Sequence, residues 1–289
     1  MACVAMFTLG TLASALLPTF ELALAARFLA ALPHGAYFGI AALVAASLMG
    51  PGKRGRGVAV TLAVPFQSGD PAATVKRERR IFRRDQVWIA FAIGSIGFGG
   101  FFAVYTYTSP LVTSVTGLGI EIVPWVLVAS GLGMTVGNLL GGRAADHHVV
   151  WALFVSFGVF ALAMIGLAFA ARWPLGLFFF VFLVGLGASA LSPAIRTRLM
   201  DVAGDVQSLA AAINHDSLNI GNTLGALLGG AAIAAGFGYL APTWIGLALC
   251  LIGFGFSLLA LIVERQSRRL EPSRKIRLDE DAIFDRTLS

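Results

Sequence analysis

Residues 131–146, GLGMTVGNLLGGRAAD, decide the fold of this chain. The stretch begins apolar, and its glycines recur every four residues, at Gly133, Gly137 and Gly141. On a helix this spacing places the glycines on one face, where a neighbouring backbone can approach closely, as helices do inside bilayers. The polar residues Arg143 and Asp146 follow at once. We therefore expect a membrane helix that leaves the hydrocarbon at Gly142 and enters a charged turn over 142–148.

The composition extends this reading to the whole chain. Its 289 residues are 57% hydrophobic and 12% charged, with a mean hydropathy of +0.83. Soluble domains carry about 25% charged residues, and apolar runs of about 20 residues are long enough to cross a bilayer. The sequence therefore predicts an all-α, polytopic membrane protein. Its two cysteines and four histidines form no metal-ligand motif, and no nucleophile–base set appears, so we expect no metal, no cofactor and no enzyme activity.

The apolar runs predict about eight transmembrane helices. Two precede the basic turn at 51–57, and six follow residue 85, at 87–110, 122–141, 149–171, 174–195, 209–235 and 239–263. Residues 58–64 are too few to cross a core of about 30 Å at about 1.5 Å per residue. The expected domains are a two-span remnant of an N-terminal bundle (1–65), a cytoplasmic basic linker (66–85), a six-span bundle (86–264) and a cytoplasmic tail (265–289).

The basic residues predict the orientation. If both ends of an eight-span chain lie on one side, that side carries nineteen Lys and Arg, and the other side carries only Arg172. Because cytoplasmic loops are enriched in Lys and Arg, we expect a multi-pass plasma-membrane protein with both termini in the cytoplasm. This distribution also accounts for the net charge of +6 without a nucleic-acid partner.

Three stretches carry a family resemblance. GNLLGGRAADHH (137–148) resembles the signature cytoplasmic loop of the major facilitator superfamily. RFLAALPHGAYFGIAALVAASL (27–48) resembles its fourth span, and 191–230 resembles the tenth-to-eleventh region of arabinose-efflux and chloramphenicol-exporter permeases. The resemblance implies two six-helix bundles and alternating access around a midplane site. It also implies a cytoplasmic gate, for which the alternative is a solvated basic turn; the gate residues are Gly137, Gly141, Gly142, Arg143 and Asp146.

The chain also departs from this family. The family has twelve spans, so the eight expected here lack the counterparts of spans one, two, five and six. Arg196 and Asp216 place charges where relatives usually have uncharged residues. The leading hypothesis is a proton-coupled efflux permease for a small molecule such as a sugar or drug. The alternative is a non-transporting remnant, or a module that needs a partner chain for the missing spans. With two spans opposite six, we expect little coupled transport by the chain alone.

The span at 209–235 carries the candidate cavity residues. His215, Asn219 and Asn222 follow an i, i+4, i+7 pattern, and Asn214 and Asp216 lie beside them. Polar groups at membrane depth usually face the bundle interior or a cavity. A carboxylate or imidazole there can carry a coupled proton. The alternatives are hydrogen bonds between helices, and for Asp216 a position close enough to the cytoplasmic end to reach water.

Four further residues are candidates. Arg27 lies inside an apolar run with His34 seven residues later, and the resemblance implies a proton-relay or substrate-orienting role for the arginine. The alternative is a side chain that snorkels to the interface. Tyr105 could contact a substrate, although aromatic residues near span ends are more often interface anchors. Asn138 is expected to form a hydrogen bond across helices.

Overall fold

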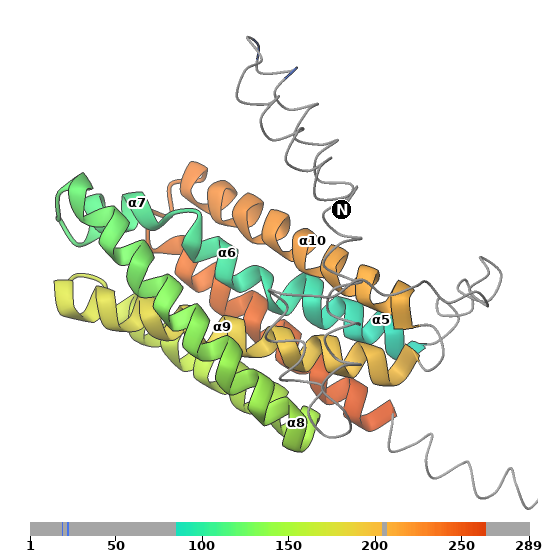
Figure 1. Cartoon of the computed structure of the whole chain (residues 1–289). Coiled ribbons are helices and arrows are strands. Elements are labelled where there is room, and N and C mark those ends of the chain that lie inside the picture. The colour runs from blue at the N-terminus through green and yellow to red at the C-terminus, as the bar shows by residue number, and fades with distance from the viewer. Residues whose placement is uncertain (1–18, 20–21, 23–84, 204–206, 264–289) are drawn as a thin grey trace, which may run out of the picture.

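The structure is a computed structural model, and it describes residues 85–203 and 207–263 together with Thr19 and Leu22. Within these residues it is helical, with no β-strand. The helices lie side by side in one bundle (Figure 1). The two expected spans before residue 51, the basic linker and the tail lie outside the described residues, as do Arg27 and His34.

The first pass through the bundle is not one regular helix. It consists of α5 (Asp85–Ala92), the π-helical turn η2 (Ile93–Gly97) and α6 (Gly99–Tyr105). It continues through the short segments α7 (Thr108–Pro110), η3 (Leu111–Val115) and η4 (Ile120–Ile122). Between η3 and η4 the chain turns at Gly117, whose φ of +76° favours glycine. The expected span at 87–110 is therefore helical, but it is interrupted by a π-bulge.

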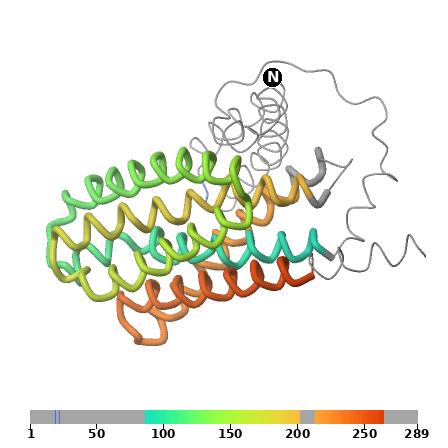
Figure 2. The backbone as a smooth tube through the Cα atoms, turned by 90° about the horizontal axis from the view of Figure 1, so that it is seen from below, coloured from blue at the N-terminus to red at the C-terminus, as the bar shows by residue number. Residues whose placement is uncertain are grey.

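Helix α8 (Val123–Ala170) is a helical hairpin. Only His148 has non-helical angles, φ −161° and ψ 100°, and there the chain reverses, as Figure 2 shows. The first arm covers residues 123–147 and the second 149–170. The expectation that the helix ends at Gly142 is therefore wrong. Gly141 and Gly142 are both buried, and neither has a positive φ, so close packing keeps them helical.

Three helices complete the bundle: α9 (Pro174–Ala203), α10 (Gln207–Ala234) and the last helix (Ala241–Val263). The expected end of a span at residue 195 is wrong, because α9 continues to Ala203. Within the described residues, four stretches are long and apolar enough to cross a membrane: Gln86–Tyr105, Ile120–Ala170, Pro174–Asp201 and Ala241–Val263. The second of these contains both arms of α8.

Small residues join the first arm of α8 to α9. A Cβ atom on Gly133, Gly137 or Gly141 would collide with the backbone of Phe182, Leu186 or Ala190, respectively. These pairs advance in the same direction along both helices, so the first arm and α9 run parallel. We call this contact the α8–α9 seam, and it confirms the packing role expected from the glycine spacing.

A second seam joins α6 to α10. A Cβ on Gly99 would lie 2.7 Å from the carbonyl oxygen of Gly221, and one on Gly225 would lie 2.9 Å from the backbone nitrogen of Ala103. On its other side, Gly100 packs against Gly246 of the last helix, 2.5 Å from its carbonyl oxygen by the same measure. The helix α6 is therefore held between two close neighbours. We call the first of these contacts the α6–α10 seam.

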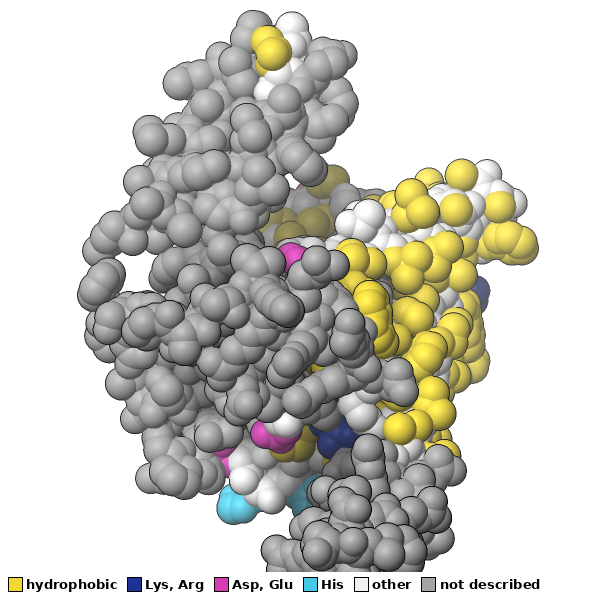
Figure 3. Space-filling view, turned by 90° about the vertical axis from the view of Figure 1, so that its right-hand side faces the viewer, with side chains coloured by type: hydrophobic (Ala, Val, Ile, Leu, Met, Phe, Trp, Pro, Cys, Tyr) yellow, Lys and Arg dark blue, Asp and Glu magenta, His cyan; other side chains and the backbone are white. Residues whose placement is uncertain are grey.

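The outer surface of the bundle is apolar and suits lipid. Large hydrophobic side chains are exposed along it, among them Leu162, Phe169 and Leu227, at 67–70% of their area. Figure 3 shows such side chains over one flank of the described helices. All five tryptophans are exposed near helix ends, which is where an aromatic belt meets the membrane interface; they are Trp88, Trp125, Trp151, Trp173 and Trp244.

Candidate functional site

The polar residues of α10 do not share one environment. Asp216, Asn219 and Thr223 are exposed, and they recur three and four residues apart on one face of the helix. His215 and Asn222 are half-buried beside this face. We call the exposed residues the outward polar face of α10. Because they lie in the middle of a 28-residue helix in an apolar bundle, they require a cavity, water or another polar helix.

Asn214 points the other way. Its side chain is only 2% exposed, and its Oδ1 atom has no hydrogen-bond partner among the described residues. The neighbouring Ser217 donates from Oγ to the Asn214 carbonyl oxygen at 2.7 Å and packs against Gly94 of η2. Asn214 therefore belongs to the contact between α10 and the first pass. The i, i+4, i+7 stripe expected for His215, Asn219 and Asn222 lies along the border between the buried and the exposed sides of α10, because Asn219 is exposed and the other two are half-buried.

Two arginines on α9 were assigned to a turn by sequence reasoning. Since α9 continues to Ala203, Arg196 and Arg198 lie within the helix. Arg198 is 8% exposed and donates from a terminal guanidinium nitrogen to Gln86 Oε1 at 3.2 Å. Gln86 in turn donates to the carbonyl oxygen of Ala260 at 3.1 Å. This chain of bonds ties α9, α5 and the last helix together.

Arg196 has a different environment. Its side chain is half-buried, and its Nε atom is buried without a hydrogen-bond partner in the part of the chain that the structure describes. Asp216 makes no ion pair with it. The two residues nevertheless lie at one level, because their neighbours Ile195 and Ser217 both contact the same position, Gly94. The position of Arg196 and Arg198 within α9 could have been predicted from the residues after 195, which include no glycine or proline until Gly204.

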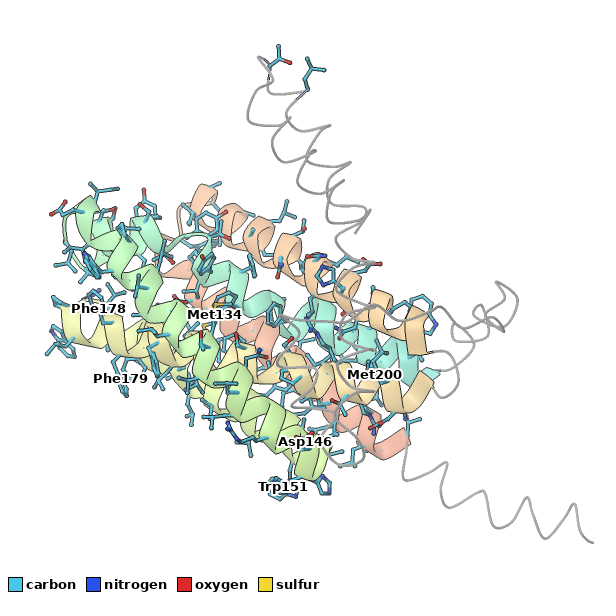
Figure 4. All side chains as sticks on the ribbon, viewed as in Figure 1. Met134, Asp146, Trp151, Phe178, Phe179 and Met200 are labelled. Carbon is cyan, nitrogen blue, oxygen red and sulfur yellow. The ribbon has the colours of Figure 1, made fainter. Side chains whose placement is uncertain are left out.

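The expected gate residues occupy the end of the bundle at which α8 reverses. Gly137, Gly141 and Gly142 are buried, Arg143 is exposed and Asp146 is half-buried. Arg143 and Asp146 stand three residues apart on the regular helix of the first arm, one turn before the reversal. Figure 4 shows Asp146 and Trp151 together at this end, far from Phe178 and Phe179 at the other. These charged groups therefore lie near the end of the bundle at which α8 reverses.

The tyrosines near the opposite end have separate roles. Tyr107 donates its hydroxyl to the carbonyl oxygen of Ala226 at 2.8 Å and so closes the end of the α6–α10 seam. Tyr105 is exposed, and its ring stacks on Phe101 with centroids 5.2 Å apart. Asn138 is half-buried in the first arm of α8. Among the described residues there is no cluster of three His, Cys, Asp or Glu that could hold a metal ion.

Comparison with known proteins shows which family this sequence resembles. The family Major Facilitator Superfamily matches residues 89–284. The inner membrane transport protein YdhP of Escherichia coli is 31% identical over 296 residues, covering 86% of this chain and 76% of YdhP. The putative transporter AraJ of Escherichia coli is 25% identical over 84% of this chain and 72% of AraJ. The chloramphenicol resistance protein of Streptomyces lividans is 24% identical over 78% of this chain and 70% of that protein.

The fold has a solved counterpart. The crystal structure of the Escherichia coli fucose:proton symporter FucP superposes with a TM-score of 0.64, at 13% identity, over 89% of this chain and 83% of FucP. At that identity the match concerns the fold alone. The family match covers more than half of the chain, and YdhP matches most of it. These matches confirm the resemblance expected from the sequence, and this chain therefore belongs to the major facilitator superfamily.

Proposed function

We propose that this chain is a proton-coupled export permease for a small organic molecule. Its relatives are named as transport proteins, and one is named for chloramphenicol resistance. The observation that carries the proposal is the outward polar face of α10, because a polar face in an otherwise apolar bundle is how a membrane protein lines a route for a polar solute. The substrate would bind between this face and the rest of the transporter during alternating access.

In this mechanism Asp216 is the proton carrier, with His215 beside it as the alternative. Asp216 is an exposed carboxylate in the described bundle and makes no ion pair with Arg196, so proton binding would change its charge without breaking a salt bridge. At the far end of the first arm of α8, Arg143 and Asp146 act as the gate. Contacts that differ between the inward-open and outward-open states would bias the two.

A second candidate function has its own observation. The YdhP alignment spans 296 positions, but 86% of 289 residues is about 249, so about 47 positions of YdhP have no counterpart here. That is about the length of two membrane spans with a turn. A chain shortened in this way would leave the outward polar face uncovered. It would then be a non-transporting remnant, or would require a partner chain to supply the missing helices.

Reconstitution separates these functions. The purified chain is placed in liposomes with a pH gradient, acid inside, and uptake of radiolabelled chloramphenicol is measured. We expect gradient-driven accumulation that collapses with a protonophore and becomes independent of the gradient in Asp216→Asn. Arg172→Gln, in the exposed turn between α8 and α9, is the control and should transport normally. A monodisperse chain that moves neither chloramphenicol nor arabinose would favour the remnant or the partner-dependent module.

A further inference from the structure

The two arginines of α9 provide the starting observation, because they differ in their partners. Arg198 is buried and bonded to Gln86. Arg196, two residues earlier, is half-buried, and no atom of residues 85–203 or 207–263 forms a hydrogen bond with its Nε. Arginine remains protonated under all ordinary conditions, so Arg196 cannot reduce its charge by losing a proton. A cation at this position is costly unless an anion compensates it.

The position of Arg196 places its charge inside the bundle. It precedes the end of α9 at Ala203 by seven residues, or about 10 Å along the helix axis. Its neighbour Ile195 has 1% exposure and contacts the Gly94 position. Ser192, one turn earlier, is half-buried on the same face of the helix. Arg196 therefore lies well inside the helix end, on a polar strip of α9.

The carboxylate of Asp216, which lies at this level of the bundle, does not neutralise Arg196. Asp216 lies on the adjacent helix α10, next to Ser217, yet no ion pair joins the two side chains among the described residues. The charge of each side chain can therefore pair with a charged group of a bound ligand. A guanidinium presents a planar fork of donors that matches a carboxylate in a bidentate geometry.

We infer that Arg196 binds the carboxylate of an organic anion, and that carboxylate-bearing small molecules are therefore among the substrates of this chain. The inference rests on the proposed transport function, since it assigns a ligand to a position at the same level of the bundle as Asp216. Arg196 supplies the charge, and the half-buried Ser192, one turn earlier on the same face of α9, is the polar group beside it. Asp216, on the next helix, disfavours a second negative charge, so monocarboxylates are preferred over dicarboxylates.

The test uses benzoate as the probe, with benzyl alcohol and benzylamine as neutral and cationic analogues. The melting temperature of the purified full chain in detergent is measured against the concentration of each probe. We expect a saturable rise of about 2–5 °C with benzoate at saturating concentration and no such rise with the two analogues. In Arg196→Gln the rise should vanish. In Arg196→Lys the concentration needed should increase about tenfold, because the charge remains and the fork is lost.

Controls guard against nonspecific salt effects and misfolding. Arg172→Gln should keep the full benzoate shift. The melting temperature of Arg196→Gln without benzoate should equal or exceed that of the wild type, since an uncompensated charge is removed. Equal benzoate shifts in the wild type and Arg196→Gln, or no shift in either, would overturn the inference. If Arg196→Gln does not fold, the inference stands or falls on the affinity of Arg196→Lys.

Transport is measured separately so that the two proposals fail separately. Proteoliposomes loaded with benzoate are tested for counterflow of radiolabelled benzoate. An Arg196-dependent thermal shift without counterflow supports the anion site and contradicts the proposed transport. Chloramphenicol transport without an Arg196-dependent benzoate shift supports transport and contradicts the anion site.

Discussion

The α8–α9 seam and the α6–α10 seam use the same packing device but carry opposite outer surfaces. In both, parallel helices approach through glycines that meet a neighbouring backbone. The first arm of α8 exposes apolar side chains on its other side, including Leu132, Val136 and Leu140. The helix α10 exposes Asp216, Asn219 and Thr223 instead. The comparison teaches that the seams fix where helices lie, whereas the opposite face decides whether a helix presents an apolar or a polar surface.

The largest effect is expected when a seam itself is disrupted. Gly137→Leu places a side chain where the backbone of Leu186 already lies, so α8 and α9 must separate. Overpacking of this kind costs about 1–3 kcal/mol or more. The melting temperature in detergent and the fraction of monodisperse protein should both fall. Gly131→Leu is the matched control, because a Cβ at Gly131 meets nothing within 4 Å, and it should leave both unchanged.

A smaller loss is expected at the end of the α6–α10 seam. Tyr107→Phe removes the hydroxyl that donates to the carbonyl oxygen of Ala226, at a cost of about 0.6–1.5 kcal/mol. Tyr105→Phe is the control, since its exposed ring packs against Phe101 without that bond. Both are compared by thermal unfolding in the same detergent. Equal losses in the two variants would contradict the structural role assigned to Tyr107.

The smallest effect on stability is expected on the outward polar face of α10. Asn219→Leu makes this face resemble the outer face of α8, and it should shift stability by no more than about 0.5 kcal/mol while reducing transport. The reciprocal change, Leu132→Asn, puts a polar group on an apolar outer face and should lower the melting temperature without a specific effect on transport per folded molecule. Asn219→Leu protein that transports normally would remove this face from the solute route.

Much of the fold was predictable because its signals are local. The spacing of Gly133, Gly137 and Gly141 predicted a close helix contact, and the apolar runs predicted the spans at 149–171, 209–235 and 239–263 to within two residues of the helices found. The helix ends were less predictable. A charge was taken to end α9 at 195, yet Arg198 stays inside because Gln86, from a helix far away in sequence, accepts its hydrogen bond.

In the candidate site, too, local signals in the sequence were predictable and contacts between helices were not. Spacing placed His215, Asn219 and Asn222 on α10, but it could not say which side of the helix the neighbours would cover. The positions of Gly94 and Gly99 against α10 settled that, by burying Asn214 and leaving Asp216 and Asn219 outside. Arg196 was not among the residues proposed from the sequence, because no local pattern shows that its Nε is buried without a hydrogen-bond partner among the described residues.

Sequence alone predicted the membrane class, the resemblance to the family and the helices on which most of the polar residues lie. These follow from hydropathy, residue spacing and short motifs, which act within one helix. Tertiary packing decided where α8 reverses, how far α9 extends and which side chains remain without partners. Those outcomes depend on contacts between helices up to 174 residues apart, such as Gln86 with Ala260, whose free energies no local pattern encodes.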